Sequence, residues 1–258
     1  MIIDAHCHAG KGDGLSGPWD TEAPLDAYLQ RAAESRIGRT IVFPAFHTDY
    51  AVANRAVAAL VARHPQRLWG FAFIHAERDR GKVGEMVGTA VRQYGFRGIK
   101  VHRHDAPISR EICEAAAHFR LPVLYDVVGE VATIELFARQ YRQVNFIIPH
   151  LGSFADDWKA QLAVTDHLVR HDNVFTDTSG VRRFDLLLHC YRRAGASKII
   201  FGSDGPWLHP GVELSKIYAL KAPAAAQERM LAGNILELIG ERAAAVPGKQ
   251  ELRIQLDR

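Results

Sequence analysis

Short apolar runs rich in β-branched residues alternate along this chain with longer segments of helical periodicity. The apolar runs are Met1–Ala5, Thr40–Pro44, Leu68–Ile74, Gly98–His102, Pro122–Asp126, Asn145–His150, Val174–Asp177 and Lys198–Asp204. The helical segments are Ala23–Ser35, Tyr50–His64, Lys82–Tyr94, Ser109–His118, Val131–Tyr141, Trp158–His171, Arg183–Ala194 and, with flanking structure, Glu213–Gly240. Continuous apolar runs between amphipathic helices are typical of a parallel sheet whose faces are covered by helices. Eight such units favour closure over an open doubly wound sheet, so the sequence predicts an α/β fold, a single (β/α)8 TIM barrel.

The length and composition of the chain fit one barrel of this kind. A chain of 258 residues, 48% hydrophobic and 24% charged, can bury a large core and is not disordered. We see no linker rich in Pro, Gly or Ser, and we expect residues 1–258 to form one domain. The tail Ala243–Arg258 is open between a short added strand and a segment that trails into solvent.

Net charge and cysteine content indicate which kinds of binding partner and which cellular compartment to expect. The net charge is only +3 and the basic residues are scattered, so we expect neither a nucleic acid nor a membrane as partner. The start MIIDAHCHAG carries an acid and histidines where a signal peptide needs a basic start and an apolar run. Cys7, Cys113 and Cys190 are odd in number and far apart, which argues against a disulfide framework. We therefore expect a cytoplasmic protein that binds a small-molecule substrate, with homo-oligomer formation left open.

Ionisable residues stand at the ends of several apolar runs. These residues are His6 and His8 after the first run, Lys100 and His102 in the fourth, Asp126 in the fifth, His150 in the sixth and Asp204 in the last. An ionisable group at a buried strand end costs desolvation energy unless it is paired or bound to a metal. Because barrel strands end together at one mouth, where active sites form, we expect these side chains to meet there.

The pattern His6-Cys7-His8 suggests a metal site. Alternate residues of a strand point to the same side, so both imidazoles can face one ion. Asp204 ends the last strand, which closes beside the first, and two imidazoles with a carboxylate suit zinc or another divalent first-row metal. A histidine pair near an N-terminus also occurs by chance in solvent, and the strand pattern with Asp204 in register is what favours the metal reading.

His150, Lys100 and His102 are open between chemical and structural roles. His150 ends an apolar run and suits a general acid or base at the mouth, although a buried histidine can also simply donate to a carbonyl. Lys100 could bind an anionic substrate, form a structural ion pair or be carbamylated to bridge metals. His102 could ligate metal, bind substrate or line the upper barrel beside an acid.

The chain resembles the amidohydrolase-related family (amidohydrolase 2), which includes aminocarboxymuconate-semialdehyde decarboxylase, related decarboxylases and hydratases, and lactone and ester hydrolases. The matching segments are IDAHCH at 3–8, GFRGIKVH at 95–102, LPVLYD at 121–126, NFIIPHLG at 145–152, NVFTDTSG at 173–180, IIFGSDGPW at 199–207 and GNILELIG at 233–240. The resemblance implies a metal-dependent enzyme in which His6, His8 and Asp204 bind one divalent ion, with Zn²⁺ favoured over Mn²⁺ or another metal. It also implies that His150 acts as acid or base.

One segment departs from the family pattern. The family usually carries a histidine ligand at the end of strand five, where this chain has Tyr125-Asp126. Asp126 can still coordinate zinc through oxygen, so we include it among the expected ligands, and His102 could supply a compensating nitrogen.

A metal held by the expected ligands predicts hydrolysis of an ester, lactone or amide. The metal would lower the pKa of a bound water, and His150 or Asp204 would take a proton as that water attacks the carbonyl. The metal, with Lys100 or His102, would stabilise the oxyanion, and Arg103 together with Arg97 near strand four suggests a small acidic substrate. Loss of carbon dioxide from a substrate carboxylate is the alternative within the family.

Two other classes of function remain as hypotheses. A metal-free binding protein on the same barrel is one, because a fold does not fix a function and Asp126 replaces a histidine. A metal-dependent phosphoesterase or nuclease is the other. It is disfavoured because no glutamate ends a predicted strand to bridge further metals and the charge balance gives no footprint for a polynucleotide.

Overall fold

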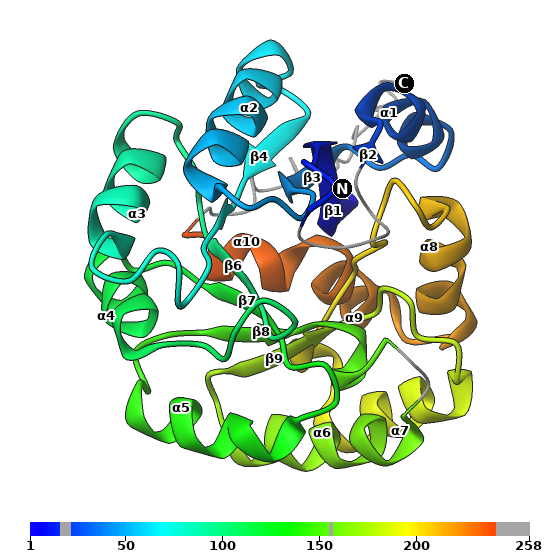
Figure 1. Ribbon diagram of the computed structural model, residues 1–258. Coiled ribbons are helices and arrows are strands. Elements are labelled where there is room, and N and C mark those ends of the chain that lie inside the picture. The colour runs from blue at the N-terminus through cyan, green and yellow to red at the C-terminus, as the bar shows by residue number, and fades with distance from the viewer. Residues whose placement is uncertain (16–21, 155–156, 241–258) are drawn as a thin grey trace, which may run out of the picture.

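The structure, a computed structural model, describes residues 1–15, 22–154 and 157–240, and shows strands at the centre with helices around them (Figure 1). The strands are β1 Ile3–Lys11, β2 Glu22–Ala23, β3 Arg39–Pro44, β4 Leu68–Gly70, β5 Ala72–Phe73, β6 Ile99–His102, β7 Val123–Asp126, β8 Phe146–Ile148, β9 Val174–Asp177 and β10 Ile199–Ile200. The α-helices are α1 Leu25–Glu34, α2 Tyr50–Arg63, α3 Val83–Arg92, α4 Arg110–Phe119, α5 Ile134–Gln140, α6 Trp158–Arg170, α7 Phe184–Ala194, α8 Pro210–Ala219, α9 Ala224–Glu228 and α10 Asn234–Leu238. Short 3₁₀ turns lie at Val131–Thr133, Pro149–Gly152 and Ala196–Lys198, and a π turn at Arg229–Gly233 links α9 to α10.

The strands pair in chain order and in parallel, apart from the antiparallel pair β1–β2. One sheet has the order β2-β1-β3-β4 and the other runs from β5 through β6, β7, β8 and β9 to β10. The predicted strand Leu68–Ile74 is divided at Phe71 into β4, which pairs with β3, and β5, which pairs with β6. The backbone of this segment still connects the two sheets. Phe71 N donates to Val42 O of β3 over 3.0 Å, and Arg97 N, just before β6, donates to Gly70 O over 2.8 Å.

Hydrogen bonds between the first strand and the segment after β10 close the ring. Ala5 N donates to Phe201 O over 3.0 Å, Asp204 N donates to His6 O over 2.7 Å, and Cys7 forms a parallel bridge with Gly205. Only Ile199–Ile200 of the predicted eighth strand is regular, but the following residues stay beside β1. The fold is therefore the (β/α)8 TIM barrel that the sequence predicts.

A bulge in β1 decides which of its side chains face the barrel interior. Asp4 pairs with Thr40 and Cys7 with Val42, so β1 has one more residue than β3 across this interval. Ile3 and Ala5 belong to the inner apolar cluster, whereas Cys7 belongs to the cluster outside the barrel. The extra residue thus changes the alternation and turns His6 and His8 into the mouth, as bulges near active sites commonly do.

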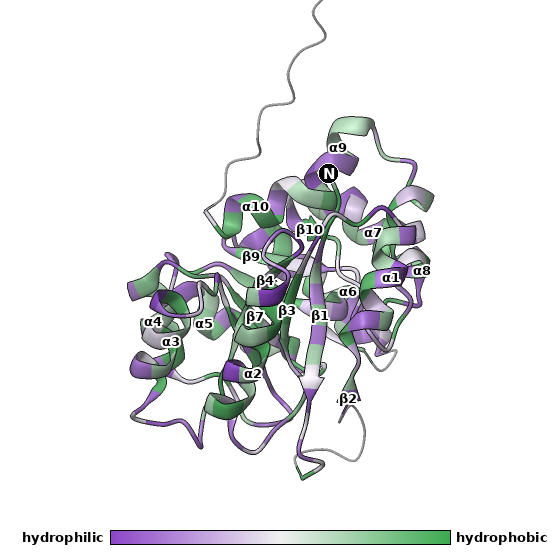
Figure 2. Cartoon of the chain, turned by 90° about the horizontal axis from the view of Figure 1, so that it is seen from above, coloured by the Kyte–Doolittle hydropathy of each residue, from purple (hydrophilic) through white to green (hydrophobic). Residues whose placement is uncertain are grey.

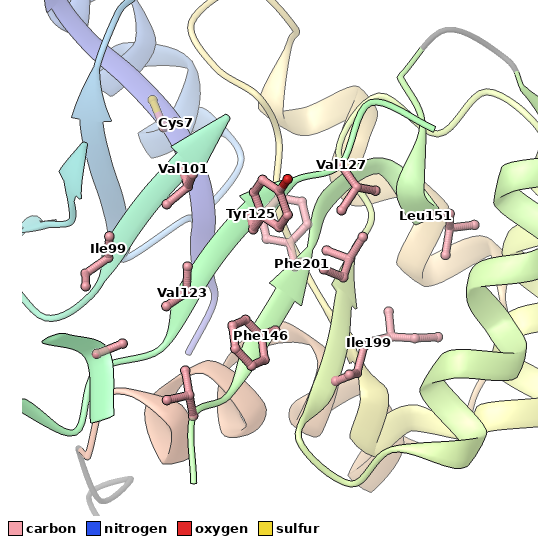
Figure 3. Packing of buried hydrophobic residues seen from close by; sticks show 14 of the residues in the cluster. Cys7, Ile99, Val101, Val123, Tyr125, Val127, Phe146, Leu151, Ile199 and Phe201 are labelled. Carbon is pink, nitrogen blue, oxygen red and sulfur yellow. The ribbon is translucent and has the colours of Figure 1, made fainter. Parts of the chain in front are cut away.

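Two apolar cores hold the barrel. The outer core lies between strands and helices, and Figure 3 shows part of it, including Ile99, Val101, Val123 and Tyr125 on the neighbouring strands β6 and β7. The inner core contains Phe43, Phe71, Phe73, Leu124 and Ile147 from the strands together with Ile235, Leu236 and Leu238 from α10. In Figure 2 the central strands are largely hydrophobic, while β1 carries hydrophilic bands. The last helix therefore helps to fill the barrel interior.

The C-terminal region differs in detail from the sequence prediction. Instead of one helical segment over Glu213–Gly240, the chain forms α8, a break that contains Pro223, α9, the π turn and α10. The tail Ala243–Arg258 lies outside the described residues. None of the helices in the described ranges has both the length and the apolar character needed to cross a bilayer.

Candidate metal centre

His6, His8 and Asp204 meet at the mouth of the barrel although almost 200 residues separate them in sequence. Asp204 Oδ1 lies 3.3 Å from His6 Nε2 and 3.6 Å from His8 Nε2. All three residues are buried, with 1%, 4% and 8% exposure for His6, His8 and Asp204. One ligand atom of each residue lies within 4.8 Å of the others, which is a spacing that one metal ion can bridge. The structure therefore brings together the expected histidine pair and the expected carboxylate.

Each imidazole of this cluster is oriented by a hydrogen bond from its other nitrogen. His6 Nδ1 lies 2.8 Å from Asp177 Oδ2, and His8 Nδ1 lies 2.9 Å from Pro44 O. Because a carboxylate and a carbonyl both accept, each Nδ1 carries the proton and each Nε2 presents a lone pair to the mouth. Metal-binding histidines are typically held by such partners, which fix the tautomer.

His6 Nε2 supplies the test of whether these residues fit a metal. It is buried and has no hydrogen-bond partner within the described part of the chain. A buried nitrogen without a partner is costly unless something binds it. Burial lowers the pKa of His6, against the charge of Asp177, and lowers that of His8 well below its usual value. Both rings are thus neutral at pH 7, the state in which imidazole binds a metal, and the donor set fits a divalent ion.

A second group of side chains continues the site around His150. His150 Nδ1 donates to Ser179 O over 2.7 Å, and His150 N donates to Asp177 Oδ1 over 3.2 Å. Asp177 also accepts from Ser179 Oγ over 2.5 Å. Asp177 therefore orients His6 and His150 together. The rings of these two histidines lie 5.0 Å apart, centre to centre.

Asp126 lies between two histidines on the other side of the cavity. Its Oδ2 is 3.2 Å from His102 Nε2 and 3.4 Å from His150 Nε2. Burial alone would raise the pKa of Asp126, but its contacts with His102 and His150 hold that pKa well below the usual value. Burial would likewise lower the pKa of His150, and Asp126, with Asp204 and Asp177, instead raises it to about 9. In this arrangement His150 is a proton donor held beside an ionised carboxylate.

Lys100 is the buried lysine of the site. Its side chain is 0% exposed, its Nζ lies 5.0 Å from the centre of the Phe43 ring, and it lines the mouth cavity. Burial lowers the pKa of Lys100, although Asp126, Asp204 and Asp177 oppose that effect. No described carboxylate forms an ion pair with Lys100. The amino group of Lys100 is therefore available to a ligand in the cavity.

The backbone at two site residues is in a strained region. Asp204 has a φ of 57° and His150 a φ of 59°, both in the left-handed region that residues other than glycine seldom occupy. Such conformations persist where surrounding structure fixes them, and they are concentrated at functional sites. Asp204 is fixed by its bond to His6 O, and His150 by its bond to Asp177.

These groups line one cavity of about 510 Å³ at the mouth. Its polar lining consists of His6, His8, Lys100, His102, His104, Asp126, His150, Ser153, Asp157 and Asp204, and its apolar walls of Phe46, Val128, Phe154, Trp207 and Leu208. The Trp207 ring lies 4.6 Å from that of His8. A cavity lined by both aromatic and ionisable side chains suits a small molecule that has an apolar body and a polar reacting group.

Two of the expected residues lie away from the His6–His8–Asp204 cluster. Arg103 does not line the mouth cavity. It pairs with Glu130 over 3.0 Å and lines a separate cavity against α4 and α5. Asp126 lines the mouth cavity, but it belongs to neither ligand set that contains His6 and instead pairs with His102 and His150. Arg103 is therefore held outside the mouth cavity by Glu130, whereas Asp126 lies in the cavity beside two imidazoles and its role as a metal ligand stays a prediction.

Asp177 is the main site residue that was not predicted from the sequence. It ends the predicted strand Val174–Asp177, so the strand-end rule that selected Asp126 and Asp204 applied to it as well. The aromatic wall residues Phe46 and Trp207 stand in loops after strands, and their types alone do not separate wall residues from ordinary loop residues.

Sequence comparison identifies a family. A family model described as Amidohydrolase matches residues 3–240, which is more than nine-tenths of the chain. A search of curated proteins finds no match.

Comparison with solved structures finds the same fold at low sequence identity. A 5-carboxyvanillate decarboxylase from Sphingomonas paucimobilis superposes with a TM-score of 0.74 at 13% identity, covering 94% of this chain and 99% of that one. A 5-carboxyvanillate decarboxylase from Novosphingobium aromaticivorans, solved with manganese and 4-hydroxy-3-methoxy-5-nitrobenzoic acid, gives 0.72 at 13% identity, covering 93% and 96%. A probable 2-pyrone-4,6-dicarboxylic acid hydrolase from Acinetobacter baumannii gives 0.70 at 15% identity, covering 93% and 99%.

Proposed function

The chain belongs to the amidohydrolase family, and on that premise we propose that it is a divalent-metal-dependent hydrolase of small anionic esters, lactones or amides. The observation that carries this proposal is the unpartnered His6 Nε2, which faces His8 Nε2 and Asp204 Oδ1 in a buried mouth. His6, His8 and Asp204 would hold the ion. When bound, a divalent ion supplies Lewis acidity that acidifies water and polarises a carbonyl.

Asp204 and His150 divide the proton transfers between them. Asp204 lies 3.3 Å from His6 Nε2 and 3.6 Å from His8 Nε2, where its carboxyl group is placed to accept the proton of an attacking water. His150, whose pKa is raised to about 9, holds a proton that it can give to the departing oxygen or nitrogen. Asp126 is a positioning residue here, because it touches His150 Nε2 and keeps that ring charged.

Lys100 supports the anionic part of the proposal. A lysine that is buried without a carboxylate partner has lost its hydration, and a negatively charged substrate group can compensate that loss. His102 lines the same cavity and would contribute a second contact. Arg103 has no part in this proposal, because Glu130 holds it outside the cavity.

Decarboxylation is the second candidate, and a specific observation favours it. Lys100 and His150 line the same cavity, which also has aromatic lining residues. An aromatic acid whose carboxylate left as carbon dioxide would leave its bonding electron pair on the ring carbon, and His150 would supply the proton that this carbon needs. Two of the superposed structures are decarboxylases.

The test measures bound metal and both products in one set of proteins. We would express wild type, His6→Ala and Asp204→Asn in metal-replete medium, with His118→Ala on the exposed face of α4 as the control. Wild type and control should carry about one equivalent at the mouth, of zinc or manganese, and both site variants should lose most of it. Acid release from esters and lactones would indicate hydrolysis, and carbon dioxide release from aromatic acids would indicate decarboxylation.

Two results would contradict the proposal. Equal metal content in wild type and both site variants would dismiss the ligand assignment. A folded wild type without metal and without turnover on either panel would favour the metal-free binding protein instead.

A further inference from the structure

A second group of side chains of the types that ligate metals lies in the outer layer of helices, away from the mouth cavity. Glu135 is in the first turn of α5, His167 is near the end of α6, and His171 caps the end of α6. We call these three residues the peripheral cluster. Figure 1 shows α5 and α6 on the outside of the barrel, and none of the three residues lines the mouth cavity.

The spacing of the peripheral cluster is that of a ligand set. One ligand atom from each residue lies within 4.8 Å of the others. His171 Nε2 is 2.9 Å from Glu135 Oε2, and His167 Nδ1 is 3.8 Å from the same oxygen. The two histidines are one helical turn apart, and their rings stack at 5.9 Å with an interplanar angle of 14°. Two imidazoles at this separation with a carboxylate suit a first-row divalent ion such as Zn²⁺.

One atom of the cluster lacks any other partner. His167 Nδ1 is buried and makes no hydrogen bond within the described ranges, and the side chain is 12% exposed. Burial lowers the pKa of His167, and His171 and Arg170 lower it further. The ring is therefore neutral at pH 7 and carries a lone pair for a metal.

The backbone that carries the cluster is fixed before any ion binds. Lys198 Nζ donates to His171 O over 2.8 Å, and Asn173 Nδ2 donates to Ala138 O over 3.1 Å and to Tyr141 O over 3.2 Å. These bonds set the end of α6 against the end of α5. A preformed site avoids the cost of ordering ligands on binding.

Two arginines compete for the carboxylate. Arg170 Nη1 lies 3.1 Å from Glu135 Oε2, and Arg139 Nη1 lies 3.5 Å from Glu135 Oε1. An ion on Oε2 would have to displace Arg170, so the affinity of the cluster should rise when that arginine is removed. This competition gives a test that a merely structural ion-pair network would fail.

We propose that the peripheral cluster is a second metal site, in which His167 Nδ1, His171 Nε2 and the Glu135 carboxylate bind one Zn²⁺-like ion. Water would complete the coordination. The ion would join α5 to α6 and would have no contact with the mouth cavity, so the proposal does not depend on the proposed function.

The experiment measures Zn²⁺ stoichiometry of the chelator-treated full chain by equilibrium dialysis, with circular dichroism as a check of folding. The proteins are wild type, His167→Gln, Glu135→Gln and the control His118→Gln, which alters an exposed histidine of α4. Both cluster variants should bind one equivalent less than wild type and control. Arg170→Gln should bind the second equivalent more tightly, by about three-fold, because an exposed ion pair of this kind is worth up to about 1 kcal/mol, or five-fold.

Equal stoichiometry in wild type, His167→Gln and Glu135→Gln would overturn the proposal. Weaker binding in Arg170→Gln would also overturn it, since the arginine would then support the ion rather than compete with it. Two cluster variants are used so that the failure of one to fold leaves the other as the test.

Discussion

Lys100 is fully buried, and it forms no ion pair with a carboxylate among the described residues. Its burial is costly to the folded state, whereas its charge is useful only to a ligand. We therefore predict that Lys100→Met, which keeps the length of the side chain, raises the free energy of unfolding by about 1–3 kcal/mol while it lowers turnover of anionic substrates at least 100-fold. Denaturant unfolding and steady-state kinetics measure the two effects.

The control for Lys100 is Lys159→Met on α6, an exposed lysine that should change stability by less than about 0.5 kcal/mol. A loss of stability in Lys100→Met would mean that the lysine holds the barrel together, which was the structural alternative in the sequence analysis. The position of Lys100 at a strand end is compatible with both a substrate-binding role and a structural role. Only its surroundings in the fold distinguish the two.

His150 makes the metal-free protein sensitive to alkaline pH. Its pKa is raised to about 9, against an unfolded value of about 6.5, so the folded state binds the proton more tightly. The resulting stabilisation is complete below pH 6.5 and is lost as the pH rises to 9, with a full size of about 3 kcal/mol. In Asp126→Asn the pKa of His150 should fall, so the unfolding free energy should change less between pH 6.5 and 9 than in wild type.

Chemical denaturation of chelator-treated wild type and Asp126→Asn between pH 6.5 and 9 gives the slope of the unfolding free energy against pH for each protein. Comparing slopes removes the pH-independent cost of the substitution. Parallel slopes in the two proteins would mean that Asp126 does not control the charge of His150.

At the scale of single residues, the sequence predicts which side chains gather at the mouth but not all of their partners. His6, His8, His150 and Asp204 follow from strand ends alone. Arg103 lies near strand four and suggested an acidic substrate, and only the structure shows that Glu130 holds it outside the cavity. Which partner a side chain meets depends on distant parts of the chain.

At the scale of elements, β1 packs tightly against the segment that follows β10. Gly202 lies where an added Cβ would be 2.9 Å from His6 Cβ and 3.2 Å from Asp177 Cγ. We predict that Gly202→Ala lowers the unfolding free energy by about 1–3 kcal/mol, because packed surroundings resist added volume. It should also weaken metal binding at the mouth, because Asp177 would no longer hold His6 as closely.

The matched control is Gly84→Ala in α3, where an added Cβ meets nothing within 4 Å. A helix gains about 0.5–1 kcal/mol from this change. Calorimetry and metal titration of both variants give the comparison. Equal stability of Gly202→Ala and wild type would show that β1 can move away from β10 without cost.

The bulge of β1 marks the limit of prediction for elements. The sequence predicts that His6 and His8 lie on one side of a regular strand, and in the structure they do so because β1 has an extra residue between Asp4 and Cys7. The sequence does not reveal this bulge, because the bulge is defined by how β1 pairs with β3 and not by the spacing of the two histidines. Strand positions were predictable from apolar runs, and their register was not.

For the molecule as a whole, the repeated strand–helix unit predicted the barrel, because parallel strands covered by helices must close or expose an edge. The sequence did not reveal that α10 fills the barrel interior with Ile235, Leu236 and Leu238. Those residues have the apolar pattern of any buried helix. Closure is also what brings the two ends of the described chain to one site.

The measurement that tests this account most directly is a crystal structure of the metal-replete protein, with anomalous scattering recorded at the zinc and manganese edges. We predict a peak at the mouth within about 2.0–2.2 Å of His6 Nε2, His8 Nε2 and an Asp204 oxygen. A metal-replete crystal with no peak bonded to either of these imidazoles would contradict the account.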